Sequence, residues 1–242
     1  MTTAKDLFII AIDPRAKRPV GQGDLSLALA GAELIDLIGA GAVSLDGERI
    51  VPGSEPAPAD RLLGEASAAL VRQAPHELVE DWLWRRGREL AAAYQAALEA
   101  DGQLAPGRRG RLGFGSERME LVDTEAGRRA MSRSAAEEPV LAALAAAVGI
   151  RSGKSGESEE FGDSEKFGEP EEFDESGVSE EPGKLSGESG GAGEPSEGEP
   201  VLDDDPVTTV LAAVNDAVME LEAVRQRRTI ENAAFANVWR VP

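Results

Sequence analysis

The sequence has no cysteine among its 242 residues and only one histidine. Without cysteine there is neither a disulfide framework nor a thiol nucleophile. No apolar run approaches the roughly 20 residues that a membrane-spanning helix requires. The short apolar run at residues 7–12 has neither the length nor the small-residue ending of a signal peptide. We interpret it as a buried strand or the start of a helix, and we expect a cytoplasmic protein.

Lysine is also scarce, with five residues against twenty arginines, which is typical of a GC-rich bacterial genome. The net charge of −20 is spread unevenly along the chain. Residues 152–205 contain nineteen acidic side chains and three lysines, so this segment alone carries −16. The rest of the chain carries only −4 and is nearly balanced.

The acidic segment consists mainly of Gly, Ser, Glu and Pro, a composition too poor in apolar residues to offset the entropy of ordering. We predict a disordered insertion at 151–205 within one domain, formed by a core at 1–150 and completed by helices at 206–242. Three phenylalanines, Phe161, Phe167 and Phe173, recur every six residues. They reflect either slippage in low-complexity sequence or a string that docks a protein partner.

Helical spacing and turn signals alternate in the remaining sequence. Leucine and isoleucine recur at helical intervals over residues 25–38, and Asp46-Gly47 marks a β-hairpin directly afterwards. A second helix at 88–100 precedes a second hairpin that ends near residue 122. Asp60 and Thr124 are expected helix N-caps, and Gly87 a break. The predicted fold is mainly α, a helical bundle core with two or more small β-hairpins. Expected core positions in the middle of the chain are Leu78, Trp82, Leu90, Tyr94 and Leu98.

Arginine is concentrated between residues 85 and 133, which contain ten arginines and seven acidic residues and so carry a net charge of +3. The tetrapeptide "RRGR" occurs twice there, contributing Arg85, Arg86 and Arg88 and then Arg108, Arg109 and Arg111. The guanidinium fork matches phosphate oxygens, so these six side chains are candidate ligands of anionic headgroups. Leu112 and Phe114 in the second hairpin are candidates for shallow insertion into the bilayer. Alternatively, these are ordinary solvated arginines paired with neighbouring glutamates.

Other chemistry finds less support in the sequence. The single His76 has no second histidine or cysteine beside it, and neither a GxSxG motif nor a phosphate-binding Gly-Lys-Ser/Thr loop occurs. We therefore expect no enzyme, no cofactor and no metal. Helix-plus-hairpin units are also found in winged-helix proteins, so a nucleic-acid-binding or protein-interaction module is the alternative. The slightly acidic folded part argues against nucleic acid.

The segments "DLFIIAID", "LALAGAELIDLIGAGAVSLDGERI" and "ALEADGQL" resemble the Golgi phosphoprotein 3 family. The resemblance covers most of residues 5–150 and, more loosely, 206–242. It implies a peripheral adaptor that binds anionic lipid, in the eukaryotic members phosphatidylinositol 4-phosphate, here at the inner face of a membrane. The arginines of the family's headgroup pocket fall on Ala30, Arg88 and Ala91, and its tryptophan falls near Gly21. Of these arginines, only Arg88 is retained.

Overall fold

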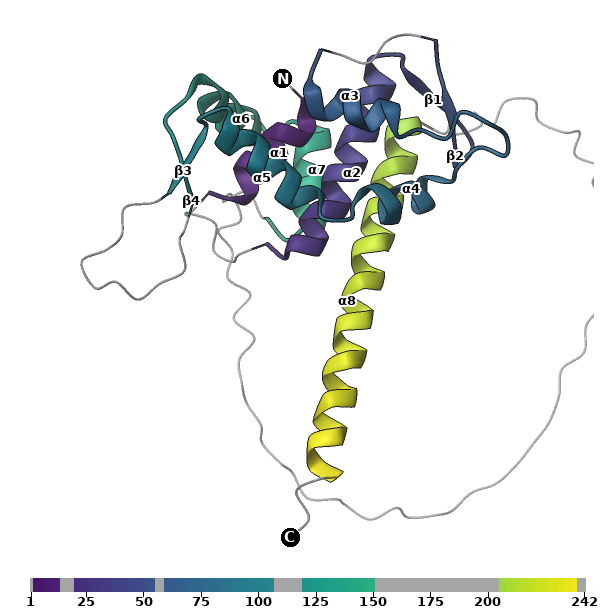
Figure 1. Ribbon diagram of the computed structural model, residues 1–242, viewed down its shortest axis with the longest axis vertical. Helices are drawn as coiled ribbons and strands as arrows, with labels where there is room; N and C mark the ends of the chain where they lie inside the picture. Colours follow the sequence, from purple (N-terminus) through teal and green to yellow (C-terminus); the bar gives the residue numbers. More distant parts are fainter. Residues whose placement is uncertain (1, 14–19, 55–58, 107–118, 151–204, 239–242) are drawn as a thin grey trace, which may run out of the picture. The chain divides into compact units, whose positions relative to one another are not determined.

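The computed structural model describes residues 2–13, 20–54, 59–106, 119–150 and 205–238. Within these residues the protein is mostly helical, with two small antiparallel hairpins (Figure 1). The predicted fold class is therefore confirmed. Three predictions concern residues outside this description. They are the disorder of the acidic insertion, the docking role of its three phenylalanines, and the lipid contacts of Arg108, Arg109, Arg111, Leu112 and Phe114.

The first apolar run, which the sequence left open as a buried strand or a helix, belongs to helix α1 (Thr3–Ala11). Thr2 caps it by accepting a hydrogen bond from the Lys5 amide. Asp36 adds a second cap from another helix, because its carboxylate accepts the Thr3 and Ala4 amides at 3.0 and 3.2 Å. These long-range bonds satisfy amides that every helix start leaves without a partner.

Helix α2 (Gln22–Gly39) is the central element of the fold. Six other helices pack on it: α1, α3 (Arg61–Ala68), α4 (Val79–Arg86), α5 (Leu90–Ala100), α7 (Pro139–Ala147) and α8 (Pro206–Val238). Its side chains are buried on nearly every face, as expected for a helix enclosed by others. At Gly31 a Cβ atom would lie 2.3 Å from the Val214 side chain. Glycine is therefore what allows α8 to approach α2 closely at this point.

The first hairpin pairs β1 (Val43–Asp46) with β2 (Arg49–Pro52) around a two-residue turn, as Asp46-Gly47 predicts. Helices α3 (Arg61–Ala68), α4 (Val79–Arg86) and α5 (Leu90–Ala100) follow. Asp60 caps α3, and Gly87 ends α4, both as expected. Four of the five expected core residues are buried, whereas Leu78 precedes α4 and is only half-buried.

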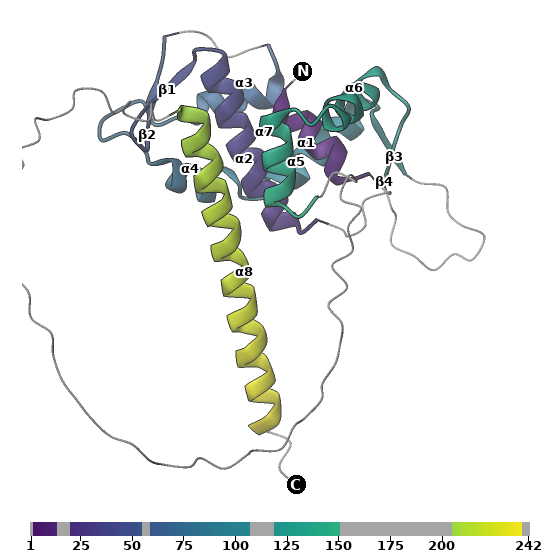
Figure 2. The same ribbon diagram turned by 180° about the vertical axis from the view of Figure 1, so that it is seen from behind.

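The second hairpin pairs β3 (Leu104–Pro106) with β4 (Met119–Leu121). Thr124 caps α6 (Glu125–Ala135), and α7 (Pro139–Ala147) follows it with proline at its start. The predicted C-terminal helical segment forms one long helix, α8 (Pro206–Val238), and no glycine or proline interrupts its residues 230–238. Figure 2 shows its first half against α2, α4 and α7 and its second half extending away from them.

Candidate functional site

The first of the two "RRGR" segments lies at the junction between α4 and α5, where the chain turns sharply. Gly87 permits this turn, since a Cβ atom there would lie 2.5 Å from the carbonyl oxygen of Leu83. Glu89, which precedes α5, adopts a left-handed backbone with φ of 56°. The three arginines of the segment have different environments.

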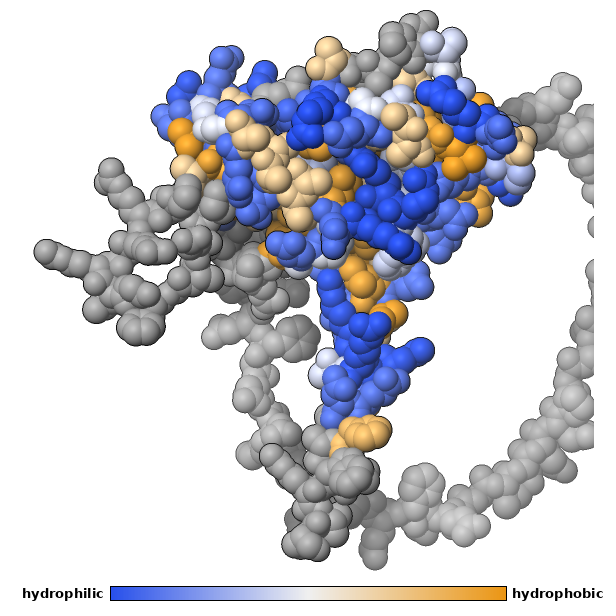
Figure 3. Space-filling view, in the orientation of Figure 1, coloured by the Kyte–Doolittle hydropathy of each residue, from blue (hydrophilic) through white to orange (hydrophobic). Residues whose placement is uncertain are grey.

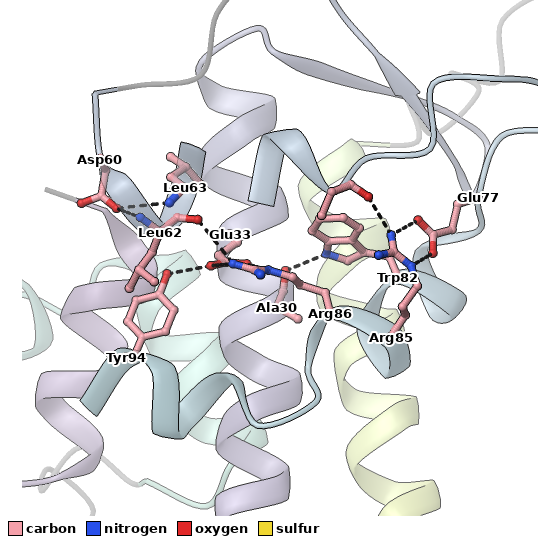
Figure 4. Close-up of polar contacts among 11 residues, drawn as sticks. Ala30, Glu33, Asp60, Leu62, Leu63, Glu77, Trp82, Arg85, Arg86 and Tyr94 are labelled. Atoms are coloured by element: carbon pink, nitrogen blue, oxygen red, sulfur yellow. Dashed lines mark hydrogen bonds and ion pairs between the residues drawn. The ribbon is translucent and has the colours of Figure 1, made fainter. Parts of the chain in front are cut away.

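Arg86 forms a two-armed ion pair with Glu33 of α2 (Figure 4). Its Nε and one terminal nitrogen lie 2.7 and 2.9 Å from the two carboxylate oxygens. The Glu33 side chain is fully buried, and the Tyr94 hydroxyl donates a further hydrogen bond to it at 3.1 Å. The guanidinium also donates to the Leu62 carbonyl. Arg86 therefore holds α2, α3, α4 and α5 together, and its fork is occupied by protein groups.

The electrostatics of this network reflect its burial. Burial raises the pKa of the Glu33 carboxyl, against the opposing hydrogen bond and charge of Arg86. The pKa of Tyr94 lies well above its usual value because of burial and the adjacent Glu33. The tyrosine therefore stays a hydrogen-bond donor. For Arg86, burial opposes the charged form, but Glu33 outweighs this effect and raises the pKa.

Arg85 is also engaged with the protein, on the opposite side of α4. Its guanidinium meets both carboxylate oxygens of Glu77 at 2.6 and 2.7 Å and donates to the Ala69 carbonyl at 3.1 Å. It lies over the ring of Trp82, 5.3 Å from the centroid, which is within the range of a cation–π contact. The hydrogen bond with Glu77 raises the pKa of Arg85. Trp82 is fully buried, and Trp84 is half-buried.

Arg88 differs from both neighbours because it makes no ion pair with any described residue, although it shares its exposure with Arg85. It projects from the corner between the two helices, next to Glu89. Of the six predicted headgroup ligands, Arg88 is therefore the one whose guanidinium the structure shows to be available. Arg108, Arg109 and Arg111, with Leu112 and Phe114, lie between β3 and β4, outside the described residues.

Ala30 and Ala91 lie in the interior rather than on this surface, with exposed fractions of 0% and 2%. The Ala30 carbonyl accepts the indole N–H of Trp82 at 3.1 Å, and the Ala91 amide donates to the Ser26 hydroxyl at 3.0 Å. Both positions belong to the packed junction of α2, α4 and α5. Neither contributes a charge to the surface around Arg88.

Comparison with protein-family models matches residues 4–159 to Golgi phosphoprotein 3 (GPP34). The chain belongs to the Golgi phosphoprotein 3 family. The match spans α1 to α7 and thus more than half of the chain. No curated protein matches the sequence.

The buried alanines Ala30 and Ala91 can be compared with the corresponding positions of the family. The resemblance equates Ala30 and Ala91 with headgroup arginines of Golgi phosphoprotein 3 proteins, and here an indole and a serine hydroxyl bind the backbone at these positions. Gly21, near the family's tryptophan, lies beside Asp24 and Arg225 at the start of α2. These two residues form an ion pair at 2.7 Å. Of the three positions that the resemblance assigns to headgroup arginines, only position 88 carries an arginine in this sequence.

The sequence did not predict the acidic residues that form ion pairs with Arg85, Arg86 and Arg225. Glu33 has a recognisable signal, because it lies with Asp36 in the otherwise apolar helical stretch "AGAELIDL". Glu77 and Asp24 carry no such signal. His76 has a buried Nδ1 without a partner, and its carbonyl accepts a bond from Arg49. Among the described residues, no group of His, Asp or Glu is arranged to hold a metal ion, and no helix is long and apolar enough to span a bilayer.

Proposed function

We propose that this protein is a peripheral membrane adaptor that binds anionic phospholipid headgroups by charge, without a stereospecific phosphoinositide pocket. The observation that supports the proposal most directly is that Arg88 has no ion pair with a described residue, whereas Arg85 and Arg86 both have one. In a member of the Golgi phosphoprotein 3 family, Arg88 stays exposed while Arg85 and Arg86 are bound by carboxylates of the protein. Arg88 and the segment with Arg108, Arg109 and Arg111 would supply the basic contacts.

The expected binding is weak and sensitive to salt. A basic residue near an anionic surface contributes about 1 kcal/mol, and the contribution falls within a Debye length of about 8 Å at physiological ionic strength. A few such arginines give reversible attachment. Leu112 and Phe114 would add to it by burying apolar surface among the headgroups. Because positions 30 and 91 are alanine, we expect little discrimination among lipids of equal charge.

The adaptor role also implies that the protein is not an enzyme and that its membrane-bound form recruits a protein partner. The sequence contains no cysteine and none of the nucleophile or phosphate-loop motifs considered above. The acidic segment at 151–205 is the candidate for such recruitment, with its three regularly spaced phenylalanines as anchors. We expect this recruitment to occur at the cytoplasmic face of a membrane.

Vesicle co-sedimentation of the full chain tests the proposal. Neutral vesicles are compared with vesicles that contain cardiolipin, phosphatidylinositol or phosphatidylinositol 4-phosphate, at low and physiological salt. Arg88→Glu should weaken binding to every anionic vesicle severalfold, and reversal of Arg108, Arg109 and Arg111 should weaken it further. Arg72→Glu is the matched control, because Arg72 is exposed, has no ion pair among the described residues and lies outside the arginine-rich residues 85–133.

The outcomes separate the alternatives clearly. Equal binding by wild type and both charge-reversed variants would contradict the assigned surface. A strong preference for phosphatidylinositol 4-phosphate over phosphatidylinositol at matched charge would show that a stereospecific pocket exists despite Ala30 and Ala91. Absence of vesicle binding together with binding to duplex DNA would favour the nucleic-acid alternative.

A further inference from the structure

Helix α8 carries two heptad-spaced stripes on different faces. The first consists of Val210, Val214, Ala217 and Leu221, which pack against the core. The second begins half-buried at the edge of the core, becomes exposed along the helix, and recurs every four and three residues in turn. Its members are Thr209, Ala213, Asp216, Glu220, Ala223, Arg227 and Ile230. A repeat of this kind is the spacing by which one helix packs along another.

The first half of the second stripe lines a hollow of about 520 Å³ between α8, the β1–β2 turn and the start of α4. Its apolar lining is provided by Leu78 and Val79 opposite the alanines of α8. Four carboxylates surround this lining, and none of them has an ion pair with a described residue. They belong to Glu48, Glu80, Asp216 and Glu220. The hollow therefore fits an apolar segment that also carries positive charge.

The second half of the same stripe extends away from the core (Figure 3). Among the described residues, the last ion pair of α8 with another element joins Arg225 to Asp24, and residues 226–232 are all exposed. Ile230 and Phe235 are each 70% exposed. A single helical segment of this length is only marginally stable in water without packing. The segment also has the properties that the hollow requires, an exposed isoleucine and the adjacent arginines Arg227 and Arg228.

We propose that the occupant of the hollow is the distal half of α8 from a second copy of this chain, with the two helices antiparallel about a two-fold axis. In this register the second stripe of one copy runs along the second stripe of the other copy in the reverse order. Ile230 of the second copy covers Ala213, Arg227 of the second copy meets Asp216, and Ala223 of the second copy packs against Glu220. By symmetry every contact occurs twice, as in a closed isologous dimer.

The charge pattern selects the antiparallel arrangement over the parallel one. A parallel pair in register would place Asp216 against Asp216, Glu220 against Glu220 and Arg227 against Arg227, and like charges in such positions are destabilising. The antiparallel pair replaces these repulsions with two Asp216–Arg227 contacts. The proposal does not depend on membrane binding, because Arg88 is not part of this stripe.

Light scattering on the full chain, over about a hundredfold range of protein concentration, measures the mass directly. We expect a mass twice the 25.4 kDa of one chain at high concentration. Arg227→Glu and Asp216→Arg should each produce a monomer, since each places like charges opposite one another twice. Mixed in equal amounts, the two variants should form a heterodimer, because both of its contacts again join opposite charges. Arg128→Glu is the control, since it makes the same charge change on α6 in an exposed ion pair.

Recovery of the dimer on mixing also establishes that both variants are folded. A wild-type chain that stays monomeric at every concentration would overturn the proposal and leave the hollow to a cationic segment of another protein. A dimer that both reversals leave intact would overturn it as well. Loss of the dimer in both variants without recovery on mixing would contradict the antiparallel register.

Discussion

Arg86 and Glu33 are 53 residues apart in the sequence and meet in the interior as a two-armed ion pair. The arginine side chain is 16% exposed and the glutamate side chain 0%. The "RRGR" segment therefore contains one arginine that supports the fold beside another that remains available to a ligand.

Arg86→Met should destabilise the protein strongly. It leaves the carboxylate of Glu33 buried without a cation, and removal of one partner of such a pair costs about 3–5 kcal/mol. Urea unfolding measures the loss. The double variant Glu33→Gln/Arg86→Met removes both charges and should recover most of the stability. A double variant as unstable as Arg86→Met would show that packing of the arginine stem, not the unpaired charge, causes the loss.

The stability of the protein should depend on pH through Glu33. Because burial raises the pKa of Glu33 above its ordinary 4.5, the folded state favours the protonated form more than the unfolded state does. Its stabilising contribution is therefore complete below pH 4.5 and is lost as pH rises through the folded pKa. The free energy of unfolding of wild type relative to Glu33→Gln should fall over this range. A difference that grows with pH would contradict the direction of the pKa change.

Gly87→Ala should destabilise the α4–α5 corner. The added methyl group would lie 2.5 Å from the Leu83 carbonyl oxygen and 3.3 Å from that of Ser26, and both oxygens belong to the backbone. Accommodation requires backbone movement, which costs about 1–3 kcal/mol. Gly64→Ala in α3 is the control, because nothing lies within 4 Å of its Cβ position. It should stabilise the protein by about 0.5–1 kcal/mol, since alanine favours a helix. Thermal unfolding distinguishes the two signs.

Asp60→Ala should destabilise α3 at its first turn. The carboxylate accepts the Leu62 and Leu63 amides and forms an ion pair with Lys5 at 2.8 Å. Loss of an aspartate cap costs about 1–2 kcal/mol. Asp60→Asn keeps an oxygen for the amides and removes only the charge, so chemical denaturation should show a smaller loss. Equal losses would assign the effect to the ion pair with Lys5.

Local signals in the sequence predicted the elements well. Asp46-Gly47 set the first hairpin, Asp60 and Thr124 capped the helices expected of them, and Gly87 separated α4 from α5. Each of these signals acts within a few residues of its effect. Helix α8 continues past its arginines to Val238, because arginine is a weaker stop signal than glycine or proline.

The partners of the arginines could not be predicted in the same way. Glu33 and Arg86 are brought together by the packing of α2 against α4, and Asp24 meets Arg225 from 201 residues away. A solvated arginine and a buried one look alike in a sequence that is rich in both charges. Only the arrangement of the helices distinguishes Arg88 from its neighbours.

The position of α8 after the acidic segment has a consequence for synthesis. Val210 and Val214 close the face of α2 at Gly31, yet a ribosome makes them only after the whole acidic segment. Until then the central helix lacks its neighbour, and apolar surface stays uncovered in the nascent chain. Contacts this distant in sequence form slowly. The newly made N-terminal part is therefore expected to expose apolar surface that is prone to aggregation until α8 has been made.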